Sequence, residues 1–296
     1  MLSRQAAGSD VAASGVRLGG LMPEPIRTAR AVSEALSQAK TALDLGRAPE
    51  AEKLARAVLD ADDRHTEARK ILGGALLLQG RFEDAIEPLE AVVQISRDPS
   101  LDTQLAIALR ETGRNEAALS RLKRAIKRKP PYMVAFHELG YLLHKMKRHD
   151  EAIAAIEQGL QIAPLSGSLF VLLGGIHHAR RQMPRAKAAY ARALTISPDL
   201  SSAHYGLGSV LMDEAAYAQA ISHFRAALMG DPSDVQARLR FAACLLEAGD
   251  TDAALGLLRT AVRGDPQVYG TSLKVALSVS KGRFWLRPST AARALT

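Results

Sequence analysis

The sequence has little of what redox sites and membrane spans are built from. Aromatic residues make up 4% of its 296 residues, and Cys244 is its one cysteine, so no intramolecular disulfide can form. Cys244 lies in an apolar run, and we interpret it as a small buried residue rather than a reactive thiol. No stretch approaches the roughly 20 apolar residues that span a bilayer. We therefore predict a cytoplasmic protein without a transmembrane segment.

Common catalytic motifs are missing as well. The sequence contains neither a Gly-rich phosphate loop that ends in Gly-Lys-Ser/Thr nor a Gly-x-Ser-x-Gly nucleophile elbow. His137 and His144 stand seven residues apart, which is about 10 Å along a helix and too far for both to hold one ion. We predict that the chain is not an enzyme, and that it binds neither a cofactor nor a metal.

One pattern returns every 34 residues through the second half of the chain. Pro130, Pro164, Pro198, Pro232 and Pro266 mark the period. Small residues recur in step with these prolines: Gly140, Gly174 and Gly208; Ala152, Ala186, Ala220 and Ala254; Gly159, Ala193, Ala227 and Ala261. A fixed period of this length is typical of proteins built from stacked repeats.

The unit at 133–166 shows what one period contains. Phe136, Leu139 and Leu143 recur at three- and four-residue spacing, which places them on one face of a helix. A polar break at 147–150 separates this helix from a second one, in which small residues such as Ala152 let two helices approach closely. Pro164 ends the second helix because it has no amide hydrogen. Each period therefore predicts two helices.

This pattern resembles the tetratricopeptide repeat (TPR), which has an aromatic residue, Leu-Gly, a large apolar residue, Ala and Pro at these places. The resemblance implies an all-α fold, a right-handed α-solenoid of about seven helix-turn-helix units with a short C-terminal capping segment. The units fall near 32–65, 66–98, 99–132, 133–166, 167–200, 201–234 and 235–268. Pro88 predicts a kink or a shortened second helix in its unit. Pro49 and Pro184 fall at the start of second helices, where proline is tolerated.

The two ends of the chain carry most of its positive charge. Of the formal charge of +8, residues 1–30 hold +2 and residues 269–296 hold +5, which leaves about +1 for the array at 31–268. We predict that 1–30 is a disordered lead, with a targeting segment as the alternative. Residues 269–280 predict a capping helix. The basic-aromatic run 283–288 after it either covers the end of the solenoid or docks on a partner.

The resemblance also implies that the first helix of each unit lines a concave groove that binds ligands. Candidate partner-binding residues at the matching places are Arg110, His137, Tyr141, His144, His178 and Tyr205. The same mapping includes Thr103, Ile107, Val171, Gly175, Ser209, Met212, Leu239, Ala243 and Leu246. Tyrosine gives a large contact area and a hydroxyl at low entropic cost, so the strip suits a peptide. Relatives that clamp a terminal carboxylate have Lys and Asn at these places, and this chain does not.

The sequence thus predicts a non-catalytic scaffold that binds a peptide or a partner helix in its concave groove. One alternative is an adaptor to nucleic acid or a membrane surface, which would use the basic ends and a basic cluster: Arg121, Lys123, Arg124, Lys127, Arg128 and Lys129. Few aromatics accompany that cluster, so we do not expect nucleic-acid binding. Another alternative is a regulatory subunit of a separately encoded enzyme. The sequence does not indicate an oligomeric state.

Overall fold

The structure is a computed structural model, which describes residues 28–277 and 292. Residues 28–277 form fifteen α-helices and one 3-10 turn. The helices of the first four units are α1 (Ala29–Asp44), α2 (Ala48–Leu59), α3 (Thr66–Leu78), α4 (Phe82–Val93), α5 (Pro99–Glu111), α6 (Asn115–Ala125), α7 (Met133–Lys145) and α8 (His149–Ile162). The remaining elements are α9 (Gly167–Ala179), α10 (Met183–Ile196), α11 (Ser201–Asp213), α12 (Tyr217–Gly230), α13 (Val235–Ala248), α14 (Thr251–Gly264), η1 (Pro266–Val268) and α15 (Tyr269–Leu277).

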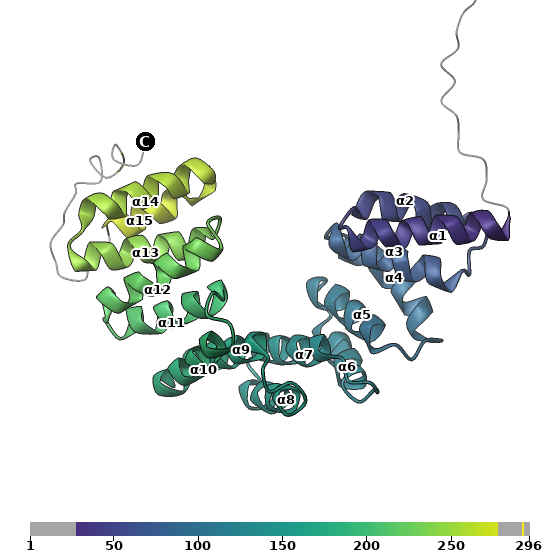
Figure 1. The fold of residues 1–296 in the computed structure, drawn as a ribbon, viewed down its shortest axis with the longest axis horizontal. Coiled ribbons are helices and arrows are strands. Elements are labelled where there is room, and N and C mark those ends of the chain that lie inside the picture. Colours follow the sequence, from purple (N-terminus) through teal and green to yellow (C-terminus); the bar gives the residue numbers. More distant parts are fainter. Residues whose placement is uncertain (1–27, 278–291, 293–296) are drawn as a thin grey trace, which may run out of the picture.

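Fourteen of these helices in residues 29–264 pack as seven consecutive hairpins, which confirms the all-α solenoid. Figure 1 shows the array as an open arc, with α5, α7 and α9 along its inner side and α6, α8 and α10 farther out. First helices of adjacent units contact one another, whereas no two second helices of the described part do. The first helices therefore lie on the tighter, concave side of the arc.

In four of the hairpins, a large residue of the second helix packs on a glycine sixteen positions earlier in the first helix. A Cβ added to Gly140 would lie 2.7 Å from Ile156, and one added to Gly208 would lie 3.1 Å from Phe224. These four pairs are Gly73–Leu89, Gly140–Ile156, Gly174–Tyr190 and Gly208–Phe224. The equivalent places in the other three units hold buried residues: Ala39 and Ala55, Ala106 and Leu122, and Ala242 and Leu258. The small partner lets the helices approach, and the larger one fills the space between them.

A left-handed residue turns the chain between the two helices of every unit. Glycine occupies this place in four units, as Gly46, Gly80, Gly113 and Gly249. Lys147, Arg181 and Ala215 take it in the other three, with φ of 64°, 58° and 60°. The turn is thus fixed by the packing of the hairpin, even where the local residue does not favour a positive φ.

The prolines behave in two ways. Pro49 and Pro184 stand in the first turn of α2 and α10, as predicted. Pro88 neither ends nor shortens its helix, since α4 runs through it to Val93 over 12 residues, as many as α2 has and one more than α6; the predicted shortening is therefore absent. Pro88 is buried, so its ring contributes to the packing of the second unit.

The C-terminal end of the array is covered by α15, which contacts α13 and α14. Ala276 and Ser272 of α15 are buried there. The predicted helix over 269–280 is thus present as far as Leu277. Most of the predicted lead at 1–30 and the basic-aromatic run at 283–288 lie outside the described residues.

Two arginines of the basic cluster serve the interior of the fold. The carboxylate of Asp102, in α5, is 1% exposed. Arg124 of α6 donates two hydrogen bonds to its Oδ1, and Nε of Arg128 lies 3.0 Å from its Oδ2. A carboxylate held away from water is stable only when it is paired, so these two side chains are committed to Asp102.

Gly206 provides a sharp test of this close packing. A Cβ at this position would lie 2.2 Å from the buried ring of Tyr190, which already fills the space beside Gly174. We expect Gly206→Ala to lower the free energy of unfolding by about 1–3 kcal/mol, because overpacking exceeds the gain in helix propensity. Gly256→Ala is the matched control in α14, where no atom lies within 4 Å, and it should stabilise the chain. Urea unfolding followed by circular dichroism measures both, and a stabilised Gly206→Ala variant would refute this packing.

Replacing Arg128 tests the pairing of the buried carboxylate. We expect Arg128→Ala to destabilise the chain by on the order of 2 kcal/mol, because Asp102 would lose one of its two cations. Lys127→Ala removes the same charge from an exposed neighbour and should change stability by less than about 0.5 kcal/mol. Thermal unfolding of the two variants side by side measures the difference, and equal melting temperatures would contradict a structural role for Arg128.

Candidate functional site

The predicted groove residues Arg110 and Tyr141 come together on the concave side. Arg110 lies in the last turn of α5 and Tyr141 lies in α7, with the guanidinium carbon 4.9 Å from the centre of the tyrosine ring. Arg110 also donates to Glu111, at 2.9 and 2.7 Å, and to Glu138 of α7. The arginine side chain is 18% exposed. This ion pair between units holds Arg110 against the ring.

Glu138 keeps its charge in this setting. Burial alone would raise the pKa of its carboxyl group, but hydrogen bonds from His137 and Arg110 and the charge of Arg110 lower it below the usual value. The pKa of Arg110 is raised, because its two carboxylate partners outweigh the effect of burial. His137 lies 3.4 Å from Glu138 through Nδ1. Arg110, Glu138 and His137 therefore form one polar cluster between α5 and α7.

A pocket of about 330 Å³ opens beside this cluster. It is lined by Arg110, Glu111, Asn115, Tyr141, Lys145 and Met146. The ammonium group of Lys145 lies 5.5 Å from the centre of the Tyr141 ring. Among the described residues, neither Lys145 nor the amide of Asn115 has an ion-pair or hydrogen-bond partner. We call these six residues the α5–α7 pocket. Its donors are available to a ligand.

The other three candidates have different neighbours. Nδ1 of His144 faces Nδ1 of His149 at 3.2 Å, and burial together with the charges of His149, Lys147 and Lys145 lowers the pKa of His144. Nε2 of His178 lies 2.9 Å from the carboxylate of Asp213, in the following unit. The six predicted residues therefore do not form one cluster.

Tyr205 is held on two sides by neighbouring helices. Its hydroxyl accepts a hydrogen bond of 2.8 Å from Arg240 of α13, and its ring packs edge to face on Phe224 at 6.0 Å. Part of this side chain thus contributes to packing, and its role in partner binding stays a prediction. Several further places mapped from the family pattern are buried: Thr103, Ser209, Leu239 and Leu246.

The places mapped from the family pattern do not include Glu138, Lys145 or Asn115. Glu138 follows His137 directly and falls between the mapped places. Lys145 is the last residue of α7 and Asn115 the first residue of α6, so both lie outside the places that the resemblance selects. A helical-wheel projection that included the last turn of each first helix would have found Lys145, since it follows Tyr141 by four residues.

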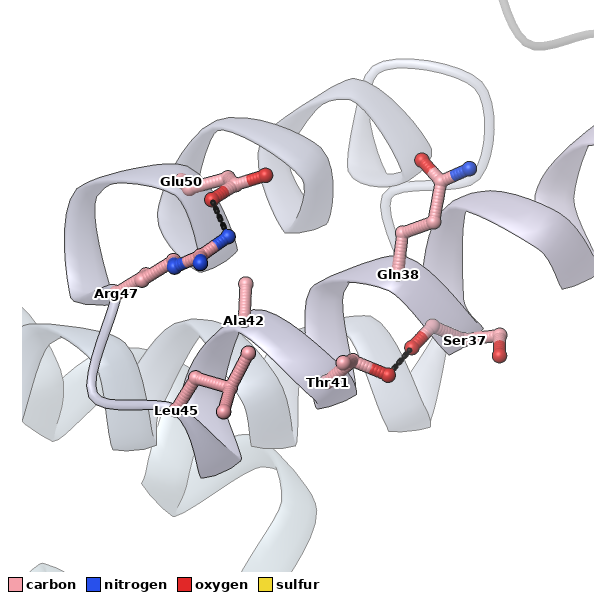
Figure 2. A pocket seen from close by; sticks show the side chains of 7 residues that line it. All are labelled: Ser37, Gln38, Thr41, Ala42, Leu45, Arg47 and Glu50. Atoms are coloured by element: carbon pink, nitrogen blue, oxygen red, sulfur yellow. Dashed lines mark hydrogen bonds and ion pairs between the residues drawn. The ribbon is translucent and has the colours of Figure 1, made fainter.

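A second pocket lies at the N-terminal hairpin and was not predicted. Figure 2 shows the side chains that line it, which come from α1, the turn after it and the start of α2. The pocket has a volume of about 220 Å³. The Thr41 hydroxyl donates to the Ser37 carbonyl oxygen at 2.9 Å, and Arg47 lies 3.8 Å from Glu50. Leu45, on its rim, is 61% exposed. These polar groups are mostly engaged with one another, so the α5–α7 pocket is the better candidate site.

No helix in the described part of the chain is long and apolar enough to cross a membrane. Across residues 28–277 and 292, no group of three or more His, Cys, Asp or Glu side chains is placed to hold a metal ion.

Solved structures of similar fold come from several proteins. PilF of Pseudomonas aeruginosa matches 69% of this chain and 93% of its own at 20% identity, with a TM-score of 0.58. A tetratricopeptide repeat protein from Parabacteroides merdae matches 82% and 98% at 14% identity, with a TM-score of 0.67. The Cut9-Hcn1 hetero-tetramer of APC/C matches 86% and 53% at 13% identity, with a TM-score of 0.66. At these identities the likeness shows the fold alone.

No curated protein matches the chain in sequence. Family models do, and all of them are described as tetratricopeptide repeat: they match residues 36–100, 103–167, 137–201 and 211–276. These matches cover most of the array of helix hairpins. The chain therefore belongs to the tetratricopeptide repeat family.

Proposed function

We propose that the chain is a non-catalytic scaffold that binds a peptide or a helix of a partner protein in its concave groove, with the α5–α7 pocket as an anchor point. Membership of the TPR family supports the general part of this proposal, because such arrays are protein-interaction scaffolds. The proposal that the partner binds at this place on the concave side is supported by the pocket itself. It combines an aromatic face with unpaired donors on the concave side.

The contacts around the pocket favour binding at low entropic cost. Arg110 is fixed by Glu111 and Glu138, and the Tyr141 ring lies close to the cations of both Arg110 and Lys145. A side chain that is already ordered loses little freedom when a ligand arrives. Among the lining residues, Arg110 and Lys145 are cationic and Glu111 is anionic. The site therefore suits a ligand that brings an acidic side chain next to an apolar one.

The adaptor function finds less support in the basic cluster. Arg124 and Arg128 are bound to the buried Asp102, and Lys123 lies 3.8 Å from Glu151. Only Arg121, Lys127 and Lys129 of that cluster have no acidic partner in the part of the chain described. A regulatory subunit of a separately encoded enzyme is compatible with groove binding, since that enzyme would then be the partner.

Partner capture with a matched pair of variants tests the proposal. The full chain captures proteins from native lysate at about 50 and 200 mM salt, beside Tyr141→Ala/Lys145→Ala and the control Lys53→Ala, which removes an exposed lysine from α2. We expect captured proteins to persist at the higher salt. Their affinity should fall at least about tenfold, or about 1.4 kcal/mol, in the double variant and remain unchanged in the control.

Melting temperatures of the three chains show whether the fold is intact. Partners that bind the double variant as well as the unchanged chain would refute the α5–α7 pocket. Phosphate-dominated binding weakens by orders of magnitude over this range of salt. A catch of nucleic acid or lipid that disappears at the higher salt would instead favour the adaptor.

A further inference from the structure

Two histidines face each other between the helices of the sixth unit. His204, in the first turn of α11, and His223, in the middle of α12, place their Nδ1 atoms 3.0 Å apart. Their ring centres are 5.3 Å apart and both side chains are partly buried. Neither residue lines the α5–α7 pocket, so the proposed groove function does not account for them.

The backbone determines which nitrogen of His204 carries its proton. Nε2–H donates to the carbonyl oxygen of Pro198 at 2.9 Å, which leaves a lone pair on Nδ1 of the neutral ring, directed at His223. Histidines that bind a metal through one ring nitrogen almost always donate the other N–H to a carbonyl, a carboxylate or water. His204 therefore already has the contact that orients a metal ligand.

The distance between the two Nδ1 atoms fits a chelate. With metal–nitrogen bonds of about 2.0–2.1 Å, two imidazole ligands of one ion place their nitrogens about 3.3–3.4 Å apart in tetrahedral geometry and about 2.9 Å apart in square-planar geometry. The observed 3.0 Å falls within this range. Without an ion, Nδ1–H of His223 donates to Nδ1 of His204. Metal binding then moves this proton from Nδ1 to Nε2 of His223, and the neutral pair releases no proton.

We propose that His204 and His223 form a two-histidine site for a divalent transition-metal cation of the imidazole-preferring kind, Cu²⁺, Ni²⁺ or Zn²⁺. Since no third His, Cys, Asp or Glu of the described residues joins them, water completes the coordination. A cavity of about 280 Å³ opens beside His204 and has room for that water; it is lined by Asp199, His204, Ala226, Met229 and Gly230. The negative charge of Asp199 favours a cation there.

A second histidine pair in the same chain provides an internal comparison. His144 and His149 have their Nδ1 atoms 3.2 Å apart and their ring centres 5.1 Å apart, much like His204 and His223. However, Lys145 and Lys147 act on His144 as positive charges. Within the described residues, neither ring donates to a carbonyl oxygen. The His144–His149 pair thus has a similar spacing of its Nδ1 atoms, but the positive charges around it oppose the binding of a cation.

Isothermal titration of the full chain, without an appended histidine tag, tests the site. NiCl₂, ZnCl₂ and CuCl₂ are titrated separately at pH 7.5. We expect one equivalent to bind, most tightly for Cu²⁺ in line with the general affinity order. His204→Gln and His223→Gln, which keep a polar side chain, should each weaken binding at least tenfold. The control His144→Gln/His149→Gln should bind as the unchanged chain does.

Two further measurements keep the test independent of folding and of the groove. Circular dichroism melting without metal shows whether the Gln variants fold, and nitrogen-detected imidazole spectra report whether Nδ1 of His204 and His223 is the atom that binds. Binding that survives both single variants, binding lost only in the control, or no binding at millimolar metal would overturn the proposal. Capture by the α5–α7 pocket does not involve either histidine, so the two proposals fail separately.

Discussion

The close approach of the two helices in each unit is the constraint on which the rest of the structure depends. One alanine of every second helix is fully buried at equivalent places: Ala51, Ala85, Ala118, Ala152, Ala186, Ala220 and Ala254. A longer side chain there would push the hairpin apart. With the hairpins fixed, each first helix contacts the first helices on either side, and the concave surface follows. The position of Arg110 against Tyr141 is a consequence of that stacking.

Charged pairs join neighbouring units from the first to the sixth, and aromatic rings add contacts in the later units. Arg81 lies 2.9 Å from Glu52 of the previous unit, and Arg114, Arg148 and Arg180 repeat this contact with Glu83, Glu116 and Asp150. These exposed pairs contribute little individually. In the later units Tyr190 packs against Gly206 of the next hairpin. The arginines in these pairs are neutralised by carboxylates, so they are not available to an anionic partner. The array accordingly has a small net charge.

The sequence predicted the fold because its signal is local and repeated. The 34-residue period, the small residues and the prolines all reflect contacts within one hairpin. Each of the seven units therefore carries the same signal. The site depends on contacts between units, and there the sequence was less informative. Arg110 and Glu138 are 28 residues apart, and Asp102 meets Arg128 across 26; neither pairing has a periodic signature. In the sequence, Asp102 is indistinguishable from a solvent-exposed charge on a helix, whereas in the structure it is buried. Tyr205 matches the groove stripe, yet Arg240 and Phe224 hold it.

A solenoid transmits structural change mainly to adjacent units, because each unit contacts only its neighbours. The α5–α7 pocket belongs to the third and fourth units, and the His204–His223 pair belongs to the sixth. An ion that fixes α11 to α12 would therefore act first on Tyr205, which follows His204 directly and packs on Phe224 next to His223. Tyr141, two units away, and Arg110, three units away, would be almost unaffected. Metal would then influence a long ligand that reaches Tyr205, while a short ligand confined to the α5–α7 pocket would bind equally well with or without it.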